Sequence, residues 1–372
     1  MQVKAPVLPF YAKLAFVLVS LLITGYLAII GKEIISPLLF AFLFSILLLP
    51  LANFFERRWY FPRSLSALLC VLLLAAAICA VLLLIGSELV SLMKDWPRFK
   101  AQLINSVHDI QAWIQVQFHL NLEKQRDLVQ NATSNMVSTS PSVIGRTLLS
   151  LSSQIILFIF MLVYVFFLLF YRHLLVRFLA AVFHPRHSTT VYEVVRQTKY
   201  IIKRYVVGLF FQLCIVAALT TAVFWIAGIP YAGLLGIFTG LLNVIPYVGI
   251  FVALFLSMFI TFSSAAAGKL LLVVIAVLVI HFLDSNVIRP RIVGSQVRVN
   301  ALISVLGVIV GEVIWGVAGM FLSIPIIAIA KIVFDRVEEL RPWGLILGEE
   351  PEEPGSRMLR LRRKAGRRRA DR

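Results

Sequence analysis

The chain alternates between long apolar runs and short polar or basic connections. Each run is at least about 17 residues long and almost free of charge, which is the length that a helix needs to cross about 30 Å of hydrocarbon. The apolar runs cover residues 14–30, 34–52, 65–86, 148–171, 206–227, 231–262, 270–288 and 301–331. This pattern predicts an all-α membrane protein, built as a polytopic helical bundle within the lipid bilayer.

The composition agrees with that fold class. Hydrophobic residues make up 60% and charged residues 14% of the 372 positions, whereas soluble chains have roughly 45–50% and 25%. A wholly water-soluble globule is therefore excluded. The formal net charge is +17, but nine of the 35 Lys and Arg residues lie in the last 16 positions and most others border apolar runs. This distribution predicts a fixed topology and contact with anionic lipid, and no nucleic-acid partner is expected.

Basic residues in the connections indicate which side of the membrane each faces. Arg57, Arg58 and Arg63 follow the second run, and further Lys and Arg residues follow the fourth, among them Arg172, Arg177, Arg186, Lys199, Lys203 and Arg204. By the positive-inside rule we expect both connections and both termini in the cytoplasm. The predicted regions are 1–86 with three N-terminal spans, 87–146 as an extracytoplasmic amphipathic helical region, 147–171 as the fourth span, 172–205 as a cytoplasmic amphipathic connector, 206–335 as the transport region, and 336–372 as a cytoplasmic charged tail.

The apolar face in the external region needs a covering surface. Its residues recur at spacings of three and four, as on one side of a helix; they are Trp96, Phe99, Leu103, Val107, Ile110, Ile114 and Phe118. Two interpretations stay open: the face packs on a neighbouring subunit or on the bundle itself, or it lies in the outer membrane interface.

The two longest runs, 231–262 and 301–331, are predicted to be interrupted. A continuous helix over the first would be about 48 Å long, well beyond the hydrocarbon core. Both runs contain the pattern G-x-x-x-x-I-P, and proline removes a backbone donor. Paired interruptions of this kind are typical of inverted-repeat transporters, although small residues four apart also serve ordinary helix packing. The expected break positions are Gly240, Pro246, Gly249, Gly316, Gly319 and Pro325.

Re-entrant hairpins and single crossings both fit these two runs. The hairpin arrangement places Arg289, Arg291 and Arg298 in the cytoplasm and so obeys the charge rule better. Single crossings would put those arginines outside, where packing within protein would have to shelter them.

No motif of soluble-enzyme chemistry occurs in the chain. H-E-x-x-H, G-x-S-x-G and G-x-x-x-x-G-K-[ST] are all absent from the sequence. Three cysteines lie inside apolar runs, without the spacing of a disulfide framework or a zinc site. We therefore expect neither an enzyme nor a cofactor or metal site, and transport driven by ATP on this chain is not expected.

Charged residues within apolar segments are the first candidates for a transport pathway. Each costs about 2.5–3.5 kcal/mol at the centre of a membrane helix, so a function or a partner must retain it. Glu312 lies near the middle of the last run, where a cation or a proton could neutralise it. The alternative is a structural carboxylate paired with an arginine or a backbone group.

A second group of candidates surrounds the C-terminal end of the 270–288 run. Three-residue spacing places His281 and Asp284 on one helical face, where they could relay protons. A solvated pair of Asp284 with Arg289 or Arg291 is the competing interpretation. The neutral candidates for binding a polyhydroxylated solute, or for hydrogen bonds between helices, are Asn243, Tyr247, Asn286 and Gln212.

Three motifs occur in a specific order: I-P-Y-V-G at 245–249, R-P-R-I-V-G at 289–294, and G-V-A-G-M-F at 316–321 followed by Pro325. In this order and spacing they resemble the autoinducer-2 exporter family of bacterial inner-membrane proteins, and the resemblance extends over most of the chain. The sequence departs from the family at Ile250 and Asn300, where members often carry proline.

The resemblance implies a multi-pass permease in the bacterial inner membrane, working as a homo-oligomer, that exports a small polar signalling molecule. Some members of the family are linked instead to sodium–proton exchange. We therefore expect transport of a small polar solute by alternating access, with sodium–proton antiport as the alternative. A membrane scaffold or assembly factor without transport activity is a second alternative.

Overall fold

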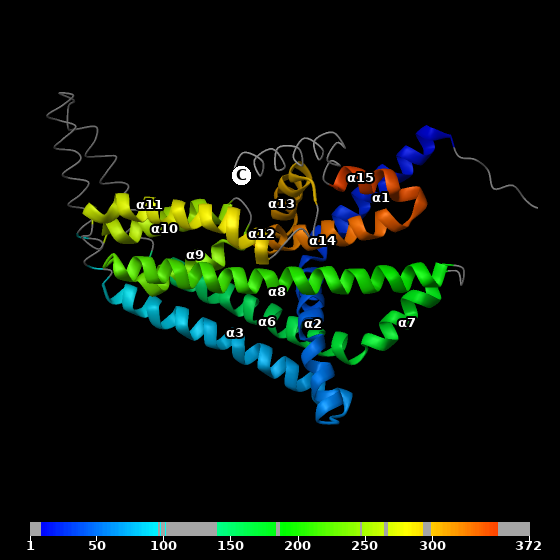
Figure 1. Cartoon of the computed structure of the whole chain (residues 1–372), viewed down its shortest axis with the longest axis horizontal. Helices are drawn as coiled ribbons and strands as arrows, with labels where there is room; N and C mark the ends of the chain where they lie inside the picture. The colour runs from blue at the N-terminus through cyan, green and yellow to red at the C-terminus, as the bar shows by residue number, and fades with distance from the viewer. Residues whose placement is uncertain are drawn as a thin grey trace, which may run out of the picture.

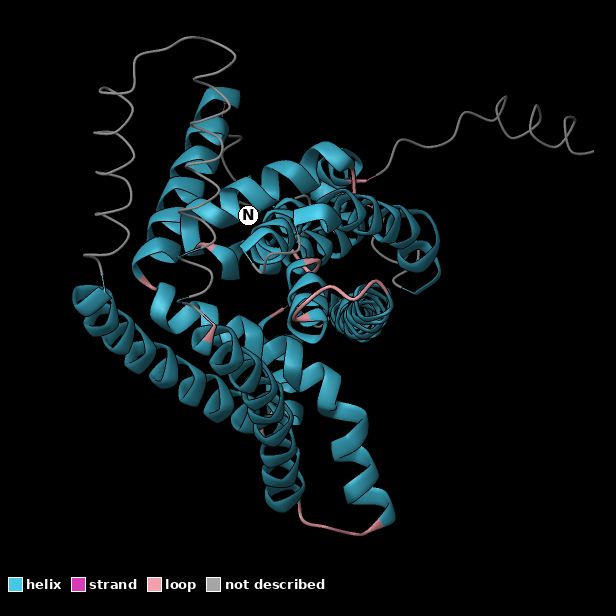
Figure 2. Ribbon diagram, turned by 90° about the vertical axis from the view of Figure 1, so that its left-hand side faces the viewer, coloured by secondary structure: helices cyan, strands magenta, loops and turns pink. Residues whose placement is uncertain are grey.

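The computed structural model describes residues 9–95, 97, 101, 140–183, 187–245, 248–263, 267–292 and 299–348. Regular structure within these ranges is helical throughout, and no strand appears among the described residues (Figures 1 and 2). The helices are α1 (Phe10–Ile30), α2 (Lys32–Arg58), α3 (Arg63–Lys94), α6 (Ser140–Phe170), α7 (Arg172–Val182), α8 (Ser188–Ile226), α9 (Ala232–Leu242), α10 (Val248–Ser263), α11 (Leu270–Leu283), α12 (Arg289–Ile292), α13 (Ala301–Trp315), α14 (Val317–Arg336) and α15 (Arg341–Leu347).

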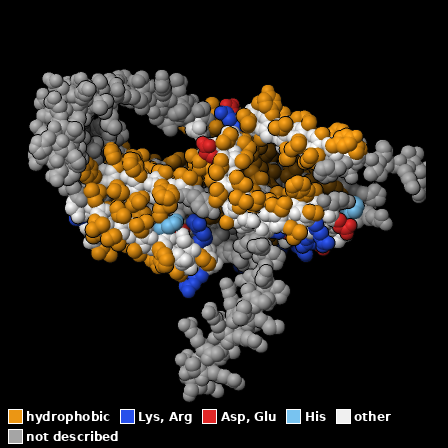
Figure 3. Space-filling model, turned by 90° about the horizontal axis from the view of Figure 1, so that it is seen from above, with side chains coloured by type: hydrophobic (Ala, Val, Ile, Leu, Met, Phe, Trp, Pro, Cys, Tyr) orange, Lys and Arg blue, Asp and Glu red, His pale blue; other side chains and the backbone are white. Residues whose placement is uncertain are grey.

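Five of the described helical stretches are long and apolar enough to cross a membrane. They are α2, residues Arg63–Leu92 of α3, α8, the stretch Leu270–Ile292 and α14. A sixth results if Gln154–Phe170 and Arg172–Val182, which bend by 71° at Tyr171, form one span. Large hydrophobic side chains cover much of the visible surface in Figure 3, as expected where lipid rather than water is the solvent. The predicted fold class is confirmed: the chain is an all-α, multi-pass membrane protein.

The longest helix, α8, organises the bundle and crosses the middle of Figure 1. It has 39 residues and continues without a break from the predicted cytoplasmic connector through the predicted span 206–227. Ile202, Tyr205 and Val206 on α8 form a buried cluster with residues of α2 and α14. Phe224, near its other end, belongs to a second cluster with α9, α10 and α11. One helix therefore joins the N-terminal spans to both interrupted segments.

A third core joins α2, α3 and α6 along the lower part of Figure 1. Small and medium side chains, among them Ala41, Ala67 and Val165, are fully buried there and allow the helices to approach closely. An ion pair closes the end of this group, with Arg172 Nη2 lying 2.5 Å from Glu56 Oε2. The pair is only partly exposed, so Arg172 is neutralised within the protein.

The first long run, 231–262, folds into α9 and α10, which pack against each other. The interruption follows Asn243, and the predicted break residue Pro246 lies outside the described residues, as does Tyr247. Gly240 is inside α9, where a Cβ atom would lie 2.8 Å from the backbone oxygen of Leu213 on α8. Gly240 is thus a close-packing position between helices and not itself a break.

The second long run, 301–331, folds into the antiparallel pair α13 and α14. The chain reverses at Gly316, whose φ of 63° lies in the region that favours glycine. Gly319 lets α14 approach α13, because a Cβ there would lie 1.9 Å from the backbone oxygen of Gly311. The predicted break at Pro325 is wrong: α14 continues through it, and the turn at Gly316 has already reversed the chain nine residues earlier.

Both interrupted runs therefore contain helices that are shorter than the membrane. The 11 residues of α9 and the 15 residues of α13 correspond to about 16 Å and 22 Å of helix rise, against about 30 Å of hydrocarbon. Backbone groups at their ends lie at membrane depth only where neighbouring helices enclose them. The tight packing of α9 on α8 and of α13 on α14 supplies that enclosure.

Candidate functional site

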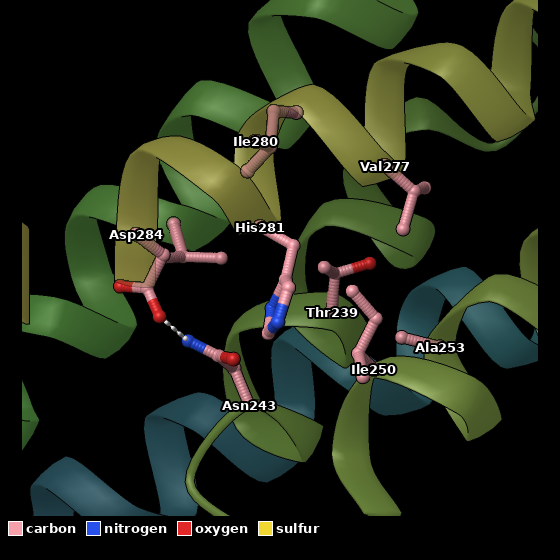
Figure 4. A pocket seen from close by; sticks show the side chains of 9 residues that line it. Thr239, Asn243, Ile250, Ala253, Val277, Ile280, His281 and Asp284 are labelled. Atoms are coloured by element: carbon pink, nitrogen blue, oxygen red, sulfur yellow. Dashed lines mark hydrogen bonds between the residues drawn. The ribbon is translucent and has the colours of Figure 1, made fainter. Parts of the chain in front are cut away.

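Asp284 is the charged side chain around which the polar candidates gather. It stands where α11 gives way to a short π-helix, Asp284–Ile288, and it is 1% exposed. π-Helical turns widen the helix locally and are frequent at functional sites. Here the turn carries the carboxylate inward between α8 and α9 (Figure 4).

Two carboxamides from other helices hold the carboxylate. Gln212 Nε2 on α8 donates to both oxygens of Asp284, at 3.0 Å and 2.9 Å. Asn243 Nδ2, at the end of α9, donates to Oδ2 at 2.9 Å, which is the dashed contact in Figure 4. A buried carboxylate is costly unless such donors satisfy it. Asp284 therefore connects α8, α9 and the π turn.

Arg289 provides the only cationic partner of Asp284 among the described residues. Its Nη2 lies 3.4 Å from Asp284 Oδ2, and its side chain is 42% exposed. The pair is thus asymmetric, with the carboxylate buried and the guanidinium at the surface. The sequence suggested a solvated pair; the structure shows instead that the carboxylate is enclosed by carboxamides and touched by arginine at its outer edge.

A small cavity of about 10 Å³ adjoins Asp284, a volume suited to one water molecule or one small ion. Its lining comes from α8, α9, α10, α11 and the π turn, and consists of Val216, Thr239, Asn243, Ile250, Ala253, Val277, Ile280, His281 and Asp284. Next to it, the Oε1 atom of Gln212 is buried and accepts no hydrogen bond among the described residues. An unused acceptor beside a buried carboxylate indicates that the site can take a further donor or a cation.

His281 points into the same cavity from α11. In Figure 4 its ring lies among Asn243, Thr239 and Ile250, one helical turn from Asp284. Its Nε2 atom is 3.4 Å from Ser285 Oγ. The predicted shared face of His281 and Asp284 thus forms one side of the cavity.

The other predicted site residues are dispersed. Glu312 is exposed on α13, which packs on α14, α1 and α2, and it does not line the cavity. Asn286 is exposed and donates from Nδ2 to the Phe282 backbone oxygen at 2.9 Å. Arg291 is exposed on α12, and Tyr247 falls outside the described residues. The structure therefore brings together Asp284, His281, Asn243 and Gln212 from the predicted set.

Thr239 is a cavity residue that sequence reasoning missed. Its Oγ1 donates to the Leu235 backbone oxygen at 2.7 Å, and its side chain faces Ile250 and Ala253 across the cavity. The available signal was its position four residues before Asn243, which places both on one face of a helix. The spacing alone does not identify Thr239 as a site residue, because its role depends on the side chains of α10 that face it.

The arrangement can perform two kinds of chemistry. Asp284 can bind a proton, or it can bind a monovalent cation with oxygen atoms as ligands, since hard cations prefer carboxylate and carbonyl oxygens. Either event neutralises a buried charge that contacts three helical elements. Neutralisation can therefore change the relative stability of different helix arrangements. Groups of three or more His, Cys, Asp or Glu able to hold a metal ion do not occur in the described ranges.

Comparison with known proteins adds an independent finding. A family model described as an AI-2E family transporter matches residues 16–339. YueF of Bacillus subtilis, named as a candidate transport protein, is 27% identical over 328 residues, covering 82% of this chain and 84% of its own. The AI-2 transport protein TqsA of Escherichia coli is 22% identical over 323 residues, covering 86% of this chain and 90% of its own. The similarity thus extends across nearly the whole described bundle.

Proposed function

This chain belongs to the AI-2E transporter family and is a multi-pass membrane transporter; on that premise we propose that it moves a small polar solute across the bacterial inner membrane, with Asp284 binding the coupling ion. The single observation that supports this proposal is the buried carboxylate of Asp284, held by Gln212 and Asn243 beside a cavity. A buried charge at the junction of interrupted helices is retained at an energetic cost, which favours a functional role.

The mechanism we propose is alternating access around the Asp284 site. When the carboxylate is charged, Gln212 and Asn243 hold it and keep α8, α9 and the π turn together. Binding a proton or a cation weakens these charge-assisted hydrogen bonds. The short α9–α10 pair is then free to shift against α11, since its helices end within the membrane rather than spanning it.

The solute we propose is small, polar and rich in hydroxyl groups, with AI-2 as the first candidate. Support comes from the carboxamide and hydroxyl groups of Asn243, Thr239 and Gln212 near the cavity, and from the name of the E. coli relative TqsA. In this proposal Glu312 is a second ion-binding candidate, standing apart on α13. Both termini lie in the cytoplasm and the transporter works as a homo-oligomer.

Sodium–proton antiport is the second candidate function, and the size of the cavity favours it. About 10 Å³ accommodates one water or one small ion but no organic solute. If the protein exchanges sodium for protons, Asp284 binds each in turn and His281 conducts the proton. Solute transport instead requires the cavity to enlarge when α9 and α10 move.

The test uses purified protein in sealed liposomes with an internal pH-sensitive dye. An imposed sodium gradient without organic solute comes first, and uptake of radiolabelled AI-2 follows. Solute uptake that requires Asp284 supports the proposed function; sodium-dependent proton movement without solute establishes the antiporter instead. If folded wild-type protein shows neither activity, the transport proposal is wrong and the scaffold alternative gains support.

A further inference from the structure

A second, larger cavity lies at the other side of the bundle, at the bend between α6 and α7. Its volume is about 510 Å³, and it is open to the surface. In Figure 1 the beginning of α3 and the bend at the end of α6 lie together in the lower right of the molecule. The lining residues are Arg63, Phe170, Tyr171, His173, Leu174 and Arg177.

Positive charge accumulates in this cavity without acidic compensation. Of the arginines nearby, Arg172 is neutralised by Glu56 at 2.5 Å and also donates to Asn53 Oδ1 at 3.3 Å. Arg63 and Arg177 have no carboxylate within ion-pairing distance among the described residues. Two exposed guanidinium groups, one at the start of α3 and one on α7, therefore face an open cavity as hydrogen-bond donors.

The same cavity has an apolar wall, which favours a phospholipid over a soluble phosphate compound as the anion bound there. Phe170 ends the apolar helix α6, and Leu174 lies on the first turn of α7 after the 71° bend. A soluble phosphate compound gains nothing from such a wall, whereas a phospholipid places its phosphate on the arginines and its acyl chains along α6. Phe178, exposed one turn further along α7, extends this apolar surface.

We propose that this cavity is a binding site for the head group of an anionic phospholipid, with Arg63 and Arg177 contacting the phosphate and Tyr171 and His173 at its edge. The site prefers an anionic lipid to a zwitterionic one, because a zwitterionic head group carries a cationic ammonium beside its phosphate, and the guanidinium groups of Arg63 and Arg177 repel that cation. A lipid held there fixes α7 at the membrane surface against the end of α3. This assignment is independent of the transported solute.

The test measures lipid binding to the full-length protein by native mass spectrometry in detergent. Phosphatidylglycerol, phosphatidylcholine and inorganic phosphate are titrated against wild type, against the double variant Arg63→Gln with Arg177→Gln, and against Arg196→Gln with Lys203→Gln. The last variant is the matched control, because it removes the same charge from exposed positions on α8. We expect the Arg63 and Arg177 variant to bind phosphatidylglycerol roughly fivefold more weakly for each arginine lost, and the control to bind as wild type does.

Three results would overturn the proposal. They are equal binding of phosphatidylglycerol by all variants, equal binding of both lipids by wild type, and displacement of the lipid by inorganic phosphate at equal concentration. The last would assign the site to a soluble phosphate compound.

Photo-crosslinking of wild type with a diazirine-labelled phosphatidylglycerol keeps the proposal testable if the variant does not fold. Labels on the peptides containing 63 or 170–177 support the site, and labels confined to other peptides refute it.

Discussion

Gln212 Nε2 donates to both carboxylate oxygens of Asp284, at 3.0 Å and 2.9 Å, although 72 positions separate the two residues. This contact joins the long central helix α8 to the π turn after α11. Asn243 adds a donor from α9. In the proposed mechanism, the protonation or cation occupancy of this one carboxylate is coupled to the relative position of three helical elements.

Asp284→Asn should lower the initial rate of ion-coupled transport at least about tenfold while leaving the protein folded. The substitution keeps the shape of the side chain but removes the charge, and hydrogen bonds to a charged group contribute about 1.5–3 kcal/mol. Transport is measured as initial rate in liposomes. Asp335→Asn is the control, because Asp335 is 46% exposed and pairs with Lys331 at the surface. A wild-type rate for Asp284→Asn would show that this carboxylate is structural.

Gln212→Leu should lower the free energy of unfolding by about 1.5–3 kcal/mol, because it leaves the buried Asp284 carboxylate with fewer donors. Thermal unfolding in detergent measures the effect. Gln197→Leu serves as the control: Gln197 accepts from Arg336 Nη2 at 2.8 Å in an exposed setting, where about 1 kcal/mol or less is expected.

Adding Asp284→Leu to the Gln212→Leu variant should recover part of the lost stability, since replacing both partners removes the unsatisfied charge. The double variant is compared with both single variants under the same unfolding conditions. Strict additivity of the two single effects would contradict the direct interaction between Gln212 and Asp284.

Gly319→Ala should destabilise the α13–α14 pair by at least about 1–3 kcal/mol, the usual effect of overpacking. The added Cβ would lie 1.9 Å from the Gly311 backbone oxygen, and backbone on both sides leaves little room to relax. Fluorescence-detected gel filtration after heating measures the loss. Gly86→Ala is the matched control, because a Cβ there meets nothing within 4 Å. Equal stability of the two variants would exclude the close helix contact.

Gly316→Ala tests backbone conformation separately from packing. A Cβ at this position meets nothing within 4 Å, but φ of 63° with ψ of −142° is open almost only to glycine. We expect a loss of about 1–3 kcal/mol, measured by the same heating assay, with no loss for Gly25→Ala, because a Cβ inside α1 at that position meets nothing within 4 Å. An unchanged midpoint for Gly316→Ala would mean that α13 and α14 join by a different turn.

The all-α, multi-pass fold and the interruption of the two longest runs were predictable because they depend on local properties. Hydropathy over about 20 residues decides whether a helix crosses lipid, and clustered Gly and Pro decide where it cannot continue. The location of the second break was not predictable in detail. Gly316 and Pro325 lie in the same run, and only the folded backbone shows that the glycine makes the turn while the proline stays inside α14.

The candidate site also contains some residues that the sequence predicted and one that it did not. Polar residues within apolar runs are candidate site residues because their burial in lipid is energetically costly. Asp284, His281, Asn243 and Gln212 were predicted on that ground. Glu312 was predicted on the same ground, but in the folded structure it is exposed on α13, away from the cavity. Thr239 was overlooked because its role depends on the opposing side chains of α10.

The sequence by itself determined that this protein is a multi-pass helical membrane protein, because burial in lipid acts on each segment separately. Only the tertiary structure decided which polar groups meet. The burial of Asp284 depends on donors that stand 72 and 41 positions away, and on a π turn that directs its side chain inward. The positive cavity at the α6–α7 bend likewise exists because Glu56 neutralises Arg172 and leaves Arg63 and Arg177 unpaired among the described residues. Contacts of this kind depend on the packing angles of whole helices, which no local pattern contains.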